Sequence, residues 1–109
     1  MIPTLFSVSY AGLWGQQRLD PVAFVRKAGT LGYCAVELMG KRPHLSVLDV
    51  DDAQIAAIRD AAAQSGVEIA TIAAYTNFTL GRDTEIPSIE IQVADVRSLA
   101  EVAARLGAR

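Results

Sequence analysis

The segment DPVAFVRKAGTLGYCAVELM, residues 20–39, combines a helix pattern with a strand pattern that follows it directly. Asp20 can accept hydrogen bonds from the free amides of a first helical turn, and Pro21 suits the first helical position. One face of this helix collects four apolar side chains: Phe24, Val25, Ala28 and Leu31. We expect Gly32 to end the helix and the apolar run at residues 34–39 to form a strand.

The same alternation of strand and helix extends to both sides of this segment. Residues 2–9 form a short apolar run with β-compatible side chains, which predicts a first strand. Downstream, either Asp51 or Asp52 can cap a second helix, and Gly66 lies just past its expected end. Residues 67–73 are rich in β-branched side chains and are expected to form a third strand.

A third helix is expected after a long loop at residues 74–87. Ser88 is the expected cap of this helix, and Gly107 is expected to close it. Helical spacing predicts a buried stripe of five apolar residues: Ile89, Val93, Val96, Ala100 and Ala103.

This order of elements predicts an α/β fold with a parallel βαβαβα arrangement. The 109 residues have room for one domain, which we place at residues 1–109. A TIM barrel has about 250 residues in eight units, or about 31 per unit. The chain therefore corresponds to the first three units of a (β/α)₈ TIM barrel, an incomplete barrel. Because parallel sheets are normally covered and closed, we expect the chain to be the N-terminal part of something larger.

Composition excludes several classes of function. Ten basic and twelve acidic side chains give a net charge of −2, which does not favour binding to nucleic acid or to an anionic membrane. The single cysteine, Cys34, excludes an internal disulfide, and we expect it to be a buried, inert thiol. The simplest expectation is a protein of the reducing cytoplasm, and no apolar stretch is long enough to span a membrane.

Candidate functional residues follow from the rule that ligands bind at the carboxyl ends of parallel strands. Glu37 is a charged residue inside an apolar strand, so it either binds a ligand hydroxyl or forms an internal ion pair. His44, in the next loop, is a candidate hydrogen-bond donor to substrate, with Lys41 and Arg42 as charges for a phosphate or carboxylate. The alternative for this loop is a solvated segment without a ligand.

Aromatic and amide side chains complete the candidate site. Tyr75 and Asn77 follow the third strand beside Phe78, and sugar sites often combine polar groups with an aromatic wall. Trp14, in the loop after the first strand, is a second candidate wall. The structural alternative is that these aromatic residues only hold their loops in place. His44 is the only histidine, so no metal site with two imidazoles can form within the chain.

The chain resembles the N-terminal portion of the xylose isomerase-like TIM barrels, the sugar phosphate isomerases and epimerases. The similarity covers the whole chain but only three of the family's eight units. It depends on four segments: Gly32-Tyr33 leading into Val36-Glu37-Leu38, Gly66-Val67-Glu68, Ala74-Tyr75-Thr76-Asn77-Phe78, and Leu106-Gly107-Ala108.

The resemblance implies an enzyme that interconverts hydroxy-carbonyl compounds, such as sugars or sugar phosphates, by metal-assisted proton transfer. In that family the metal ligands come from later strands, so this chain is assigned no metal ligand, cofactor or catalytic residue of its own. A divalent metal (Mn, Mg, Co or Zn) is implied for the complete protein. The residues that carry over as substrate-side contacts are Glu37, His44, Tyr75, Asn77 and Trp14.

Two functional hypotheses remain open from the sequence. Under the first, the chain is a fragment of such an enzyme and is inactive when isolated. Under the second, it is a stand-alone α/β binding or assembly module that forms homo-oligomers through its exposed strand edges.

Overall fold

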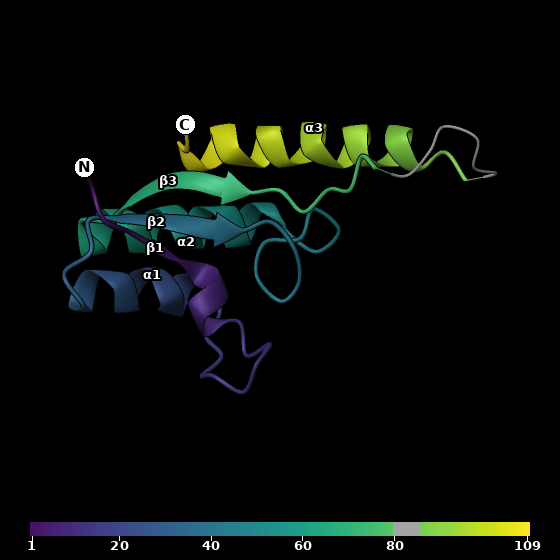
Figure 1. Cartoon of the computed structure of the whole chain (residues 1–109). Coiled ribbons are helices and arrows are strands. Elements are labelled where there is room, and N and C mark those ends of the chain that lie inside the picture. Colours follow the sequence, from purple (N-terminus) through teal and green to yellow (C-terminus); the bar gives the residue numbers. More distant parts are fainter. Residues whose placement is uncertain (80–85) are drawn as a thin grey trace.

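The computed structural model describes residues 1–79 and 86–109 and confirms the predicted parallel βαβαβα arrangement. Three strands form one parallel sheet in the order β1-β2-β3, and the sheet is open rather than closed into a barrel. Figure 1 shows α2 behind the sheet, with α1 below α2 and α3 above the sheet in this view. The elements are β1 (Thr4–Phe6), the 3₁₀ helix η1 (Ser7–Tyr10), α1 (Pro21–Thr30), β2 (Ala35–Met39), α2 (Asp52–Ser65), β3 (Glu68–Ala73) and α3 (Ser88–Leu106).

Side-chain caps fix the starts of the first two α-helices. The Asp20 carboxylate accepts a hydrogen bond from the amide of Ala23 at 2.9 Å, as predicted. Of the two candidates for α2, Asp51 is the cap, and it accepts from the Gln54 amide at 2.7 Å. The predicted Ser88 cap is wrong, because α3 begins at Ser88 itself and its hydroxyl donates to the Ile86 carbonyl. Residues 80–85 of the predicted long loop lie outside the described residues.

The first strand is shorter than residues 2–9, because the chain turns into η1 after Phe6. Ser7 is fully buried there, and its hydroxyl accepts a hydrogen bond from the Met39 amide at the end of β2. The expectation of a buried Cys34 is also wrong. This thiol lies in the connection just before β2 and is exposed, so the strand's apolar run begins one residue later than predicted.

The hydrophobic core lies on one face of the sheet, where all three α-helices pack. Val36, Leu38 and Ile69 point to this face and are buried. Strand side chains alternate between faces, so the residues between them point to the opposite, uncovered face. The helices contribute Phe24, Val25, Ala28, Ile55, Ile58, Ala61, Ala62, Val102 and Leu106 to the same core.

The predicted buried stripe of α3 is wrong. The buried residues of this helix are Leu99, Val102 and Leu106, and the last two belong to the core. Val93 and Val96 remain 36% and 38% exposed, and Ala100 is also exposed. The helix has two adjacent apolar stripes, and only one of them reaches the core formed with α2 and β3. A small groove of about 190 Å³ runs along the uncovered side, lined by Ile72, Ala74, Val96, Leu99, Ala100 and Ala103.

Among residues 1–79 and 86–109, no helix has both the length and the hydropathy that a membrane span requires.

Gly40 allows the ends of β2 and β3 to approach closely. Its amide donates to the Ala73 carbonyl at 2.9 Å, and a Cβ atom at this position would lie 2.6 Å from the same oxygen. We expect Gly40→Ala to lower the free energy of unfolding by about 1–3 kcal/mol, because the strand ends must move apart. Urea unfolding measures this change.

Gly32 provides the control for this prediction. A Cβ atom there meets nothing within 4 Å, and asparagine tolerates the left-handed backbone at φ +85°. Gly32→Asn is expected to cost less than about 1 kcal/mol. Equal losses for the two variants would show that the close contact at Gly40 is not important for stability.

Candidate functional site

The candidate site lies where the three strands end, at the right of Figure 1, where the loops after β2 and β3 gather. The pairing register puts Glu37 of β2 beside Phe6 of β1 and Thr71 of β3. These three residues lie on the uncovered face, because their neighbours Leu5, Val36 and Ile72 pack toward the core. In a closed barrel this face would be the interior. Glu37 is half-buried and makes no ion pair with any described residue.

Tyr75 connects the loop after β3 to the loop after β2. The Lys41 ammonium lies 3.9 Å from the centroid of the Tyr75 ring, which is a cation–π contact. Partial burial, and then the negative charge of Glu37, raise the pKa of the Tyr75 hydroxyl above its usual range. The hydroxyl therefore stays protonated at neutral pH and is available as a hydrogen-bond donor. Glu37, Lys41 and Tyr75 thus form one cluster at the end of β2 and β3.

His44 is buried, with only 4% of its surface exposed, and both of its ring nitrogens have partners within the protein. Nε2 lies 3.0 Å from the Leu19 carbonyl, and Nδ1 lies 2.8 Å from the Ser7 hydroxyl. A carbonyl only accepts, so Nε2 carries the proton and Nδ1 accepts from Ser7. The Ser7 oxygen in turn accepts from the Met39 amide at 2.8 Å.

This buried network joins three segments: η1 after β1, the loop at residues 11–19, and the loop after β2. The predicted alternative of a solvated loop is wrong for His44, since the ring packs 6.3 Å from Phe24, centroid to centroid. A direct contact between His44 and substrate stays a prediction, and it requires exchange of one of the two ring hydrogen bonds.

Trp14 lies at the tip of the loop at residues 11–19 and is 76% exposed. Gln16 holds this loop: its side-chain oxygen accepts from the Trp14 amide at 2.8 Å, and its side-chain nitrogen donates to the Val8 carbonyl at 3.0 Å. The indole therefore projects from a loop whose base is fixed to η1. Its role as a pocket wall remains a prediction.

Asn77 is bound by the helix that follows it. The side chain of Gln92 on α3 accepts a hydrogen bond from the Asn77 amide and donates one to the Asn77 carbonyl at 2.7 Å. The side-chain oxygen of Asn77 accepts from the amide and the hydroxyl of Thr79. Among residues 1–79 and 86–109 no hydrogen bond from its side-chain nitrogen is found, so Asn77 has a structural role in its loop, and its role toward a ligand stays a prediction.

The two basic residues of the loop after β2 differ in their surroundings. Both Nε and Nη2 of Arg42 donate to the Asp49 carboxylate at 2.5 Å. This pair lowers the pKa of Asp49 and keeps the charge of Arg42 neutralised within its own loop. Lys41 makes no ion pair with any residue that the structure describes.

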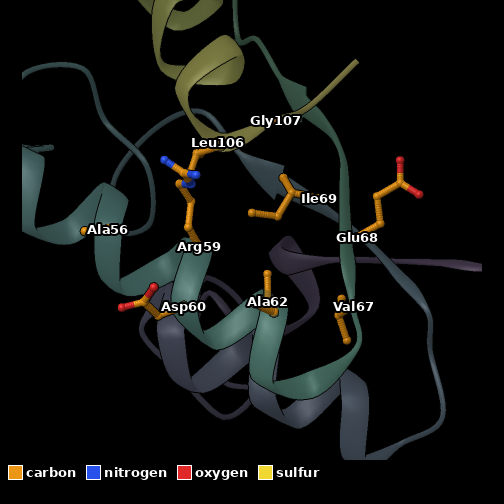
Figure 2. A pocket seen from close by; sticks show the side chains of 10 residues that line it. Ala56, Arg59, Asp60, Ala62, Val67, Glu68, Ile69, Leu106 and Gly107 are labelled. Carbon is orange, nitrogen blue, oxygen red and sulfur yellow. The ribbon is translucent and has the colours of Figure 1, made fainter.

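A pocket of about 510 Å³ lies at the opposite end of the strands (Figure 2). It is formed by α2, the start of β3 and the last turn of α3, and Ile69 points into it while Glu68 points away. In TIM barrels the chemistry takes place at the carboxyl ends of the strands, so we do not assign this pocket to the candidate site.

Metal binding is not supported by the described part of the chain. Residues 1–79 and 86–109 contain no group of three or more His, Cys, Asp or Glu side chains that could hold an ion. These residues alone therefore do not form a site for the metal that the resemblance implies, and no chemical step is assigned through it.

The sequence patterns do not indicate Ser7, Gln16 or Gln92 as site residues. Each of them acts through a hydrogen bond to a partner in another segment or to a loop backbone, and no local motif marks such contacts. For Ser7, the only signal in the sequence was the presence of a polar residue within an apolar run, which indicates a buried hydrogen bond.

The buried network predicts how stability depends on pH. Burial is the main cause that lowers the pKa of His44 below 6.5, and Arg18 also lowers it, whereas Asp20 and the Leu19 and Tyr10 carbonyls act in the opposite direction. The unfolded chain therefore binds a proton more readily than the folded one. We expect the free energy of unfolding to be highest above pH 6.5 and to fall as the pH decreases toward the folded pKa.

NMR titration of the His44 ring, together with urea unfolding between about pH 5 and 8, tests this expectation, and there is no second histidine to confuse the signal. Ser7→Ala serves as the matched variant. It leaves the Met39 amide without its partner and is expected to cost about 1–3 kcal/mol. A His44 pKa at or above 6.5 would contradict the assignment.

Comparison with known proteins identifies the fold. No protein-family model and no curated protein matches the chain. Among solved structures, it is similar to a xylose isomerase domain containing protein from Salmonella typhimurium LT2, with 29% identity and a TM-score of 0.66 over 97% of this chain. It is also similar over its whole length to a D-psicose 3-epimerase solved in the presence of D-fructose, with 18% identity and a TM-score of 0.67.

A xylose isomerase domain protein from Alicyclobacillus acidocaldarius subsp. acidocaldarius likewise matches all of the chain, with 20% identity and a TM-score of 0.63. The chain spans only 34%, 35% and 34% of these three proteins, respectively. Its open three-stranded sheet thus has the fold of about one third of a xylose isomerase-like TIM barrel.

Proposed function

We propose that the protein containing this chain is a sugar isomerase or epimerase that interconverts hydroxy-carbonyl compounds. The observation that carries the proposal is the position of Glu37, a carboxylate without an ion-pair partner among the described residues, on the uncovered face of the sheet. The similarity of the whole chain to a D-psicose 3-epimerase supports it. The proposed substrate is a sugar or sugar phosphate, and the proposed location is the cytoplasm.

The chain supplies one wall of the substrate site in this proposal. The Glu37 carboxylate accepts hydrogen bonds from substrate hydroxyls, and the protonated Tyr75 hydroxyl donates one. The Asn77 side-chain nitrogen adds a donor, and Trp14 provides an apolar wall against a sugar ring. His44 holds two of the loops through Ser7 and Leu19, so its contribution to binding is to position them.

The metal-assisted proton transfer is proposed for the whole protein, not for this chain. Neither a metal ligand nor a catalytic base is assigned to the described residues, which contain no group of three or more His, Cys, Asp or Glu side chains that could hold an ion. We propose that a divalent metal, Mn, Mg, Co or Zn, is held by other parts of the protein. The isolated chain is expected to be inactive for the same reason.

A second candidate function is a stand-alone assembly module. Two observations favour it. In the sheet formed by residues 1–79 and 86–109, β1 and β3 are edge strands, with the Ala70 carbonyl of β3 accepting a hydrogen bond from the Arg109 amide, and the adjacent stripe of α3 leaves Val93 and Val96 exposed. Light scattering of the isolated chain separates the two functions. A defined oligomer that unfolds cooperatively supports the module, and a stable monomer excludes it.

The enzymatic proposal is tested by assaying the whole protein on keto sugars with and without divalent metal. We expect activity that is lost on chelation and restored by adding metal. Glu37→Gln is expected to reduce kcat/KM about 10- to 100-fold, because hydrogen bonds to a charged group contribute about 1.5–3 kcal/mol. The free energy of unfolding should change little, because Glu37 has no described ion-pair partner.

Glu68→Gln is the matched control for this test. Glu68 lies on β3 at the other end of the sheet and points away from the pocket in Figure 2, and it pairs with Arg109 at 3.5 Å. Its replacement should leave kcat/KM within about twofold of the unmodified protein. Activity that is indifferent to metal removal, or equal effects of the two substitutions, would overturn the proposal.

A further inference from the structure

We propose that Lys41 determines substrate specificity by binding an anionic group, a carboxylate or a phosphate, at the outer end of the substrate. This inference rests on the proposed function and goes beyond it, because it distinguishes charged substrates from neutral sugars. It depends on where the ammonium of Lys41 is held and on what surrounds it.

The Tyr75 ring fixes the position of the Lys41 ammonium. Nζ lies 3.9 Å from the ring centroid, and the lysine side chain is half-buried along its length. A cation–π contact leaves the hydrogens of the ammonium that point away from the ring free to donate. Holding the side chain in one place also reduces the entropy that a flexible lysine loses on binding a ligand.

The loop provides only one cation for a ligand. Arg42 is the other basic residue, and its guanidinium is occupied by the bidentate pair with Asp49. Lys41 has no carboxylate partner in residues 1–79 and 86–109. An ammonium that forms no ion pair within these residues can still pair with an anionic group of a ligand.

The order of charges along the strand indicates the shape of the ligand. Glu37 lies two residues before the end of β2, and Lys41 lies two residues after it. At about 3.3 Å per strand residue, the backbone of Glu37 lies about 7 Å before the end of the strand. A ligand that enters the uncovered face therefore meets the ammonium at the rim and the carboxylate deeper inside.

This arrangement suits a molecule with hydroxyl groups at one end and a negative charge at the other. The deep carboxylate repels an anion and accepts hydroxyl hydrogens, so it favours only one orientation of such a ligand. The Tyr75 ring carries the Lys41 ammonium on its face, and its hydroxyl is a further hydrogen-bond donor to such a ligand.

The test uses the whole protein and three matched substrates: a neutral keto sugar, its terminal phosphate ester, and its analogue with a terminal carboxylate. The measured quantity is the ratio of kcat/KM for each anionic substrate to that for the neutral one. We expect a ratio well above 1 that decreases as salt is added. The larger of the two ratios tells whether phosphate or carboxylate is the group recognised.

Five variants separate the proposed role from a general structural effect. Lys41→Met should lower the ratio about tenfold or more, whereas Lys41→Arg should retain part of it. The control is Arg42→Met combined with Asp49→Asn, which should retain the full ratio because it removes an ion pair that is neutral overall. Tyr75→Phe should keep the ratio and Tyr75→Leu should lower it, because only the ring positions the ammonium.

The possible results distinguish this inference from the proposed function. If the neutral sugar is converted as well as its anionic forms, or if Lys41→Met acts like the double variant at Arg42 and Asp49, the inference is wrong while the proposed function stands. If none of the three substrates is converted in the presence of metal, both are wrong.

Discussion

The hydrogen bond between Ser7 and His44 is the constraint on which the arrangement of the candidate site depends. Neither residue is accessible to water to any useful extent, so each polar atom needs a partner inside the protein. Three consecutive hydrogen bonds supply these partners. The Met39 amide donates to the Ser7 hydroxyl, the Ser7 hydroxyl donates to Nδ1 of His44, and Nε2 of His44 donates to the Leu19 carbonyl. As a result, the end of β1, the loop at residues 11–19 and the loop after β2 have one fixed relative position.

Local signals in the sequence predicted the elements of the fold correctly. Asp20, Asp51 and Gly66 act at their own helix ends, within a few residues, and need no tertiary information. Predicting the buried stripe of α3 required tertiary information. Two adjacent apolar faces of this helix satisfy the same helical spacing, and only packing decides which of them is buried. Cys34 is exposed because the strand begins one residue later than predicted, and sequence patterns do not define strand boundaries to a single residue.

The candidate site was predictable only in part. Glu37 and Tyr75 were accessible to sequence reasoning because parallel strands bring their carboxyl ends together. The partner of His44 was not, because Ser7 lies 37 residues away and no motif joins them. The sequence also does not show that Arg42 is paired whereas Lys41 has no ion pair among the described residues. That difference arises because Arg42 binds Asp49, seven residues further along the chain.

The two hydrogen bonds between the Gln92 side chain and the Asn77 backbone affect how the loop after β3 can move. Because both backbone groups of Asn77 bond to a side chain of α3, the loop after β3 is attached to the outer helix rather than to the sheet. If another element packs on the exposed stripe of α3 and displaces the first turns of this helix, the loop after β3 is displaced as well. The Gln92 side chain thereby connects the outer surface of α3 to the loop at the carboxyl end of β3.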